Sequence, residues 1–136
     1  MGKKLCYIWR LLATGWCFLS FSLGGLLLAV LVFPVLNLAN LFLPESREKY
    51  QRAQAVIHFA FRFFIRQMVV LGIMRVHVSG VERLQSRQPK LILANHPTLV
   101  DVVLLISFLK HTNCVVKKAL WQDPFLGGVV RAAGYI

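Results

Sequence analysis

The sequence predicts an α/β fold that follows a membrane-associated helical segment. Two observations lead to this expectation. No charged side chain occurs from Leu11 to Pro44, and short strand-like and helix-like segments alternate after residue 73. Such alternation is typical of strands and helices layered around one core. A chain of 136 residues has room for one domain at most, and the long apolar segment leaves only a small soluble core. We therefore expect the first part of an α/β sandwich, which is incomplete.

The first segment, residues 1–44, is expected to lie in a membrane, because about 20 apolar residues suffice for a helix to cross a bilayer. A single span and a helical hairpin both fit it. Basic residues flank the apolar run at both ends, within residues 3–10 and 47–52. A hairpin that bends near Gly24–Gly25 or Phe33–Pro34 would keep both basic ends on one side, which the positive-inside bias favours.

The second segment, residues 45–73, is predicted to form a basic amphipathic helix that is rich in phenylalanine. Ser46 can cap its start and Gly72 can close its end. Polar and basic residues recur at steps of three and four along one face, namely Arg47, Gln51, Gln54, His58, Arg62 and Arg66. The pattern fits an interfacial helix in the headgroup layer, or a helix packed on a sheet with its basic face in solvent.

The third segment, residues 74–136, predicts a succession of short strands and helices. The expected strands cover residues 74–78, 91–94 and 114–116, with a further strand opening at 135–136. The first expected helix starts at Pro97 and reaches residue 109, and the second covers residues 125–133 with Gly134 as its cap. Because residues 91–94 are continuously apolar, a buried strand is expected there.

Composition narrows the possible partners. The chain has 16 Lys and Arg against 5 Asp and Glu, a formal charge of +11, and its mean hydropathy is +0.64. This combination suits an anionic membrane surface, where each Lys or Arg adds roughly 1 kcal/mol of attraction. No nucleic-acid partner is expected, because no pattern of a known nucleic-acid-binding module occurs. Cys6, Cys17 and Cys114 lack disulfide or zinc-site spacing, so free thiols are expected.

The most informative motif reads Asn-His-Pro-Thr-Leu-Val-Asp at residues 95–101. On a regular helix, His96 and Asp101 would lie about 140° apart, so they can meet only if His96 precedes the helix. Asn95 could supply the capping oxygen there. The imidazole could then accept a proton while the Asp101 carboxylate fixes its tautomer. The spacing alone is weak, since a chance match in this chain has odds of roughly one in twenty.

This motif after an apolar strand resembles the first signature of the glycerolipid acyltransferases, which include the 1-acyl-glycerol-3-phosphate and related lysophospholipid acyltransferases. Residues 115–120 resemble the family's strand-plus-lysine segment, and residues 124–127 and 134–136 resemble the run into its second signature. The family's third signature, a Glu-Gly-Thr-Arg type segment, does not occur in these 136 residues. We therefore expect the chain to be a fragment, or a truncated product that is inactive alone.

The resemblance implies a membrane-bound O-acyltransferase of phospholipid synthesis. His96 would be the general base for an acceptor hydroxyl and Asp101 would orient it, while Asn95 and Lys117 would bind substrate. Lys117 would act near the thioester or the developing oxyanion, although a solvated surface lysine is an equal alternative at that position.

The donor would be a thioester of acyl carrier protein or coenzyme A, and the acceptor a lysophospholipid such as 1-acyl-glycerol-3-phosphate. No metal or other cofactor is implied. We expect the inner (cytoplasmic) membrane, with the active site facing the cytoplasm. Two alternatives stay open: acyl transfer to another lipid, such as a glycolipid or a lipid A precursor, and a non-catalytic membrane protein in which the His/Asp pair is a relic.

Overall fold

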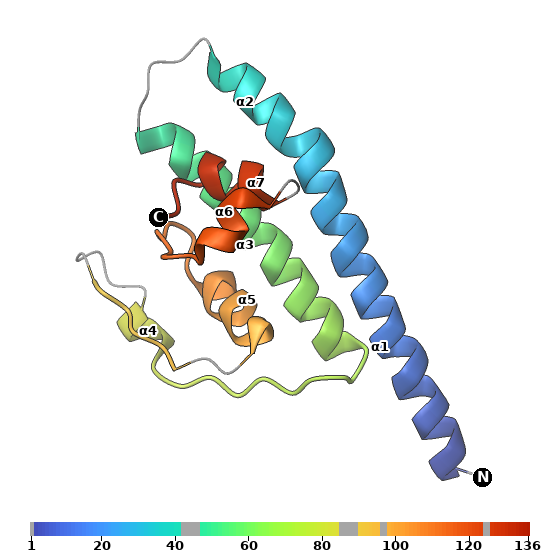
Figure 1. Cartoon of the computed structure of the whole chain (residues 1–136). Coiled ribbons are helices and arrows are strands. Elements are labelled where there is room, and N and C mark those ends of the chain that lie inside the picture. The colour runs from blue at the N-terminus through green and yellow to red at the C-terminus, as the bar shows by residue number, and fades with distance from the viewer. Residues whose placement is uncertain (1, 42–46, 85–89, 96–97, 124–125) are drawn as a thin grey trace. The chain divides into compact units, whose positions relative to one another are not determined.

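The computed structural model describes residues 2–41, 47–84, 90–95, 98–123 and 126–136. Within these ranges the regular elements are all helical (Figure 1): α1 (Gly2–Leu27), the π-helical turn η1 (Leu28–Val32), α2 (Phe33–Leu41), α3 (Arg47–Val70), α4 (Val81–Leu84), α5 (Leu99–Phe108), α6 (Lys118–Gln122) and α7 (Leu126–Ala132). The chain divides into two compact units. Unit 1 contains residues 1–17 and 58–110, and unit 2 contains residues 18–57 and 111–136.

The expected α/β sandwich is wrong, because no residue in the described ranges belongs to a strand. Residues 74–78 and 91–94 run without helix or strand structure. A strand requires a neighbouring segment that exchanges backbone hydrogen bonds with it, and no described segment does so for these two. The apolar run expected to be buried is instead on the surface, where Leu91 and Leu93 are each 87% exposed.

The one trace of strand pairing in the described residues lies in unit 2. The Val116 N–H donates to the Ile136 carbonyl at 2.7 Å, and the Ile136 N–H donates to the Cys114 carbonyl at 3.0 Å. Two bonds that bracket Val115 in this way have the pattern of parallel strands. Two hydrogen bonds are too few to form a sheet, so the regular elements of the described residues are all helices.

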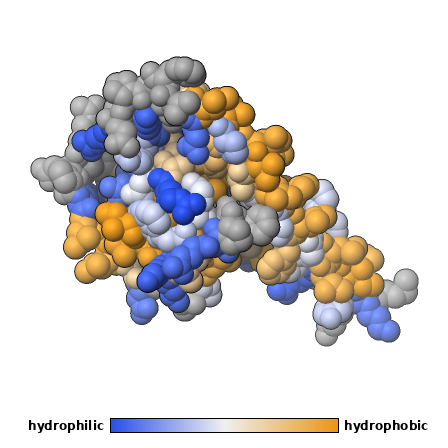
Figure 2. Space-filling view, turned by 45° about the horizontal axis from the view of Figure 1, so that its top comes forward, coloured by the Kyte–Doolittle hydropathy of each residue, from blue (hydrophilic) through white to orange (hydrophobic). Residues whose placement is uncertain are grey.

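The apolar N-terminal run is helical throughout its described length. Gly24–Gly25 lies inside α1 and Phe33–Pro34 begins α2, so the structure has no reversal at either place where a hairpin bend was expected. Residues 4–39 have a mean hydropathy of 2.4 in their most apolar window and are long enough to cross a membrane, judged by length and composition. Hydrophobic side chains cover much of the surface of this helix (Figure 2).

The π-helical turn η1 has a local cause in Pro34. Proline has no N–H to donate to the carbonyl four residues earlier, and its ring crowds that carbonyl. The Phe33 N–H reaches back to the Leu28 carbonyl, five residues away, which widens the turn. The helix therefore absorbs the proline instead of ending there.

Helix α3 has a different inner face from the expected one. Gln54 and His58 belong to the predicted polar face, yet each is only 6% exposed. Arg62 and Arg66 are exposed, and they share the outer face with large apolar side chains, namely Phe59, Phe63 and Val70, which are 57%, 71% and 76% exposed. The outer face of α3 is thus basic and aromatic, while the buried polar side chains serve internal contacts.

In unit 1, two contacts link helices that are distant in sequence. The Trp9 indole N–H donates to the Leu71 carbonyl at 3.2 Å, just beyond α3. The buried His58 Nδ1 lies 3.0 Å from the Ile106 carbonyl in α5. Helix α3 ends as expected at Gly72, whose φ of 72° is the left-handed conformation that a glycine cap adopts.

In unit 2, the Gln54 side chain joins α3 to the C-terminal residues. Its amide donates to the Asn113 Oδ1 at 2.8 Å and to the Ala133 carbonyl at 2.9 Å. Helix α7 ends at Gly134, with a φ of 68°, which confirms the expected cap. A Cβ on Gly134 would lie 2.7 Å from Tyr50 Cδ1, so only glycine lets this ring pack so closely.

Candidate functional site

Asp101 holds the first turn of helix α5. Thr98 is the N-cap and Asp101 is the third helical residue, and together they form a capping box. The Thr98 backbone N–H donates to Asp101 Oδ2 at 3.0 Å, and the Thr98 hydroxyl donates to the same oxygen at 2.8 Å. Among the described residues, only Thr98 donates to this carboxylate, and both bonds reach Oδ2. The half-buried carboxylate is therefore held in one orientation by its own helix start.

Of the other motif residues, Asn95 precedes this helix, while Leu99 and Val100 belong to it. The N-cap is Thr98, so the expectation that Asn95 caps the helix is wrong; Asn95 is exposed in a segment without regular structure. His96 and Pro97 lie outside the described residues. The helix expected from residue 97 to 109 is seen over Leu99–Phe108. The structure thus fixes one end of the predicted pair, the Asp101 carboxylate.

Lys117 lies in unit 2, whereas Asn95 and Asp101 lie in unit 1. It precedes helix α6 as its N-cap, and its carbonyl accepts the Leu120 N–H at 2.9 Å. Its side chain is exposed, and none of the described residues bonds its ammonium group. This environment fits a binding lysine and a solvated surface lysine equally well.

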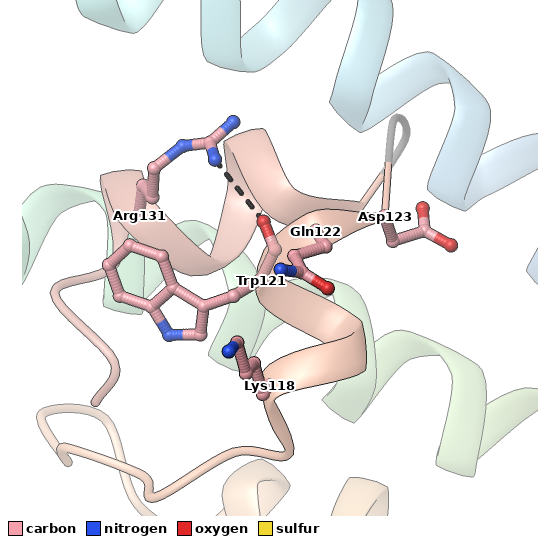
Figure 3. Close-up of a pocket in the computed structure, with 5 residues that line it drawn as sticks. All are labelled: Lys118, Trp121, Gln122, Asp123 and Arg131. Atoms are coloured by element: carbon pink, nitrogen blue, oxygen red, sulfur yellow. Dashed lines mark hydrogen bonds between the residues drawn. The ribbon is translucent and has the colours of Figure 1, made fainter.

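A pocket of about 530 Å³ lies beside helices α6 and α7 of unit 2. Its lining residues are polar or aromatic and come from α6, its C-cap and α7: Lys118, Trp121, Gln122, Asp123 and Arg131 (Figure 3). An Arg131 guanidinium N–H donates to the Trp121 carbonyl at 3.2 Å. No sequence pattern pointed to this pocket, because the approach of Arg131 to Trp121 depends on how the short helices α6 and α7 pack together.

Cys114 and Tyr135 lie in the less polar part of unit 2. Burial raises the pKa of the Cys114 thiol, and burial together with the nearby Cys114 raises the pKa of Tyr135 to about 12. Raised pKa values keep both groups protonated and unreactive near neutral pH. Tyr135 therefore belongs to the core of the unit, Cys114 is half-buried, and neither has the lowered pKa of a nucleophile.

The other histidines and acidic residues that the structure describes form no cluster that could bind a metal ion. In the described ranges, no three His, Cys, Asp or Glu side chains gather in a way that could hold a metal ion. His58 is buried against α5, while His77 and His111 are exposed. The capping box, which the sequence analysis missed, has a recognisable signal in the Thr-x-x-Asp pattern at residues 98–101.

Comparison with known proteins finds one similarity, and it covers the segment that contains the motif. The family model described as Acyltransferase matches residues 75–136, a segment that contains residues 95–101, Lys117 and the pocket residues. No curated protein and no solved structure matches the chain. Residues 75–136 of this chain are therefore similar to the acyltransferase family.

Proposed function

We propose that the chain is part of a membrane-bound enzyme that transfers an acyl group from a thioester to the hydroxyl of a lysophospholipid. The observation that carries the proposal is the acyltransferase family match over residues 75–136, which include His96 and Asp101. Residues 95–101 also resemble the first signature of the glycerolipid acyltransferases, and this likeness favours a lipid as the acceptor of the acyl group. Phospholipid synthesis is the metabolic role that such an activity serves.

In the proposed reaction, His96 is the general base. The acceptor oxygen attacks the thioester carbonyl carbon while its proton moves to the imidazole. The tetrahedral intermediate then collapses, the C–S bond breaks, and the departing thiolate takes the proton back from the imidazolium. The products are an ester and a free thiol, and His96 returns to its neutral form.

Asp101 is proposed to orient the imidazole through its second carboxylate oxygen. Its Oδ2 accepts both bonds from Thr98, so the cap and a histidine partner need not compete for the same atom. A carboxylate bonded to one imidazole nitrogen fixes the tautomer and stabilises the imidazolium. Asn95 and Lys117 are proposed to bind substrate, with Lys117 near the thioester or the developing oxyanion.

The proposed donor is a thioester of acyl carrier protein or coenzyme A, and the proposed acceptor is 1-acyl-glycerol-3-phosphate. Both substrates carry phosphate groups, which suits the formal charge of +11. We propose residence in the inner membrane with the site facing the cytoplasm. The apolar run over residues 4–39 and the outer face of α3, with Arg62, Arg66 and exposed phenylalanines, support contact with anionic lipid.

The test is the His96→Ala variant in the full reading frame that contains residues 1–136. Acyl transfer is measured with thioesters of acyl carrier protein and coenzyme A against a panel of lysophospholipids, glycolipids and lipid A precursors. Loss of the general base should lower the rate by roughly 100-fold or more. His77→Ala, which changes an exposed histidine outside the motif, is the matched control and should leave the rate unchanged. Equal rates for both variants would remove His96 from the mechanism, and transfer only to a glycolipid or lipid A precursor would replace the proposed acceptor.

A further inference from the structure

We propose that the pocket beside α6 and α7 binds the nucleotide end of a coenzyme A thioester, with its phosphates on Lys118 and Arg131 and its base against Trp121. The proposal rests on the proposed acyltransferase function, because it assigns the site that holds the acyl donor. It goes beyond that function by selecting coenzyme A over acyl carrier protein and by naming three residues that recognise it.

The geometry brings two cations and one aromatic ring to the same hollow. Lys118 and Trp121 are three residues apart on α6, a spacing that puts them on one side of a helix. Arg131 comes from α7 and is held by its bond to the Trp121 carbonyl. Figure 3 shows the Lys118 ammonium on one side of the indole and the Arg131 side chain on the other. A phosphate-bearing ligand that lies along the ring can therefore meet a cation at either end.

The close approach of the two helices depends on Gly127. A Cβ at this position would lie 2.5 Å from the Trp121 carbonyl oxygen, which no side chain can occupy without a shift of the backbone. Glycine therefore allows α7 to lie against the end of α6, and the same contact brings Arg131 to the Trp121 carbonyl. The arginine is thus positioned by the packing of α7 on α6 before any ligand arrives.

The chemistry of the lining selects a nucleotide over a simpler anion. Arginine and lysine are the usual partners of phosphate groups, and the arginine guanidinium also packs flat on aromatic surfaces. An indole offers a large apolar face for a purine base. The one acidic residue of the lining, Asp123, directs its carboxylate away from Lys118 and Trp121 (Figure 3). The volume of about 530 Å³ lies in the range typical of small-molecule sites.

Coenzyme A and acyl carrier protein share a pantetheine phosphate, so the phosphate alone does not separate them. Only coenzyme A adds an adenine ring, which the Trp121 indole can use. A nucleotide without any thioester, adenosine 3′,5′-bisphosphate, is therefore the probe of choice, with inorganic phosphate as the comparison.

Binding of the probe to the full chain is measured by calorimetry for the parent protein and for Lys118→Gln, Arg131→Gln and Trp121→Leu. Each variant should weaken binding about tenfold, the effect of losing one charge-assisted hydrogen bond or one stacking contact. Lys110→Gln, which removes an exposed lysine of unit 1, is the matched control and should bind like the parent. In the acyl-transfer assay, Trp121→Leu should raise KM for the coenzyme A thioester more than KM for acyl carrier protein, which has no adenine ring. Lys118→Gln and Arg131→Gln should raise KM for both donors, because both carry the phosphate.

The outcomes separate this proposal from the proposed function. Probe binding that none of the three pocket variants weakens would overturn the pocket assignment, even if His96→Ala abolishes acyl transfer. Binding of inorganic phosphate as tight as that of the probe, with no effect of Trp121→Leu, would overturn the nucleotide assignment. Pocket-dependent probe binding in a protein without acyl transfer would support the nucleotide site and contradict the proposed function instead.

Discussion

Asp101 combines two roles that one pair of substitutions can separate. Thr98→Ala removes the hydroxyl that donates to Oδ2 and leaves the charge of Asp101 in place. Asp101→Asn removes the charge but keeps an oxygen that can accept the Thr98 N–H, so much of the cap survives. The first change tests the helix cap, and the second tests the orientation of an imidazole.

The structure predicts similar losses of stability but very different losses of activity. A lost N-cap side chain costs about 1 kcal/mol, and a lost charge in the first helical turn costs roughly 0.3–1 kcal/mol. A domain that is stable by about 5 kcal/mol or more stays almost fully folded after either change. Thr98→Ala should therefore lower acyl transfer only a few-fold. Asp101→Asn should lower it by roughly 100-fold or more, because the imidazole loses the partner that fixes its tautomer.

Thermal unfolding in detergent and acyl-transfer rates are measured on the same preparations. Thr98→Ser retains the hydroxyl and should match the parent in both assays. Glu82→Gln removes a charge from the first turn of α4 and controls for a loss of negative charge near a helix start. If Asp101→Asn loses no more activity than Thr98→Ala at equal stability, Asp101 is only a cap and the proposed orientation of His96 is wrong.

Three further predictions concern packing in unit 2, the first with Gly72 of unit 1 as its comparison. Gly134 and Gly72 both have a positive φ, but only Gly134 lies against the Tyr50 ring. In denaturant unfolding, Gly72→Ala should therefore lower the free energy of unfolding by about 1 kcal/mol, and Gly134→Ala by clearly more. Equal losses would contradict the contact with Tyr50. Gln54→Leu should lose about 1–3 kcal/mol because it removes the donor to a buried carbonyl, and a neutral result in the same denaturant assay would refute that role. The raised pKa of Tyr135 makes the folded state hold its proton longer, so stability should be full below pH 10 and fall as pH rises toward 12, by on the order of 2 kcal/mol. Tyr135→Phe should remove that part of the fall in pH-dependent unfolding, and an unchanged slope would argue against it.

The sequence predicted the helices better than the strands of the expected sheet. Glycine caps at Gly72 and Gly134 were foreseen, because a left-handed residue is a local requirement that only one residue type meets cheaply. The strands at 74–78 and 91–94 were not realised, because strand structure depends on a partner segment and not on the segment's own pattern. Apolar character at Leu91 and Leu93 indicated burial, yet burial also needs a covering layer.

The polar face of α3 shows the same limit. A period of three and four identifies residues that share a helix face, but it does not say whether that face meets water or a buried partner. Gln54 and His58 were grouped with the arginines, yet each meets a backbone carbonyl that belongs to a distant part of the sequence. Such partners are fixed by tertiary packing, so the helix pattern alone cannot reveal them.

The capping box strengthens the case for Asp101 as an orienting residue rather than weakening it. A carboxylate that rotates freely must lose that freedom each time it meets an imidazole, and the loss opposes the reaction. The Thr98 bonds to Oδ2 already hold the Asp101 side chain in one rotamer, at the start of a helix that buries Val103 and Ile106 in the core of unit 1. The direction of the second oxygen is then set by the helix before substrate binds. On this reasoning the few-fold loss expected for Thr98→Ala measures preorganisation, while the larger loss for Asp101→Asn measures the bond itself.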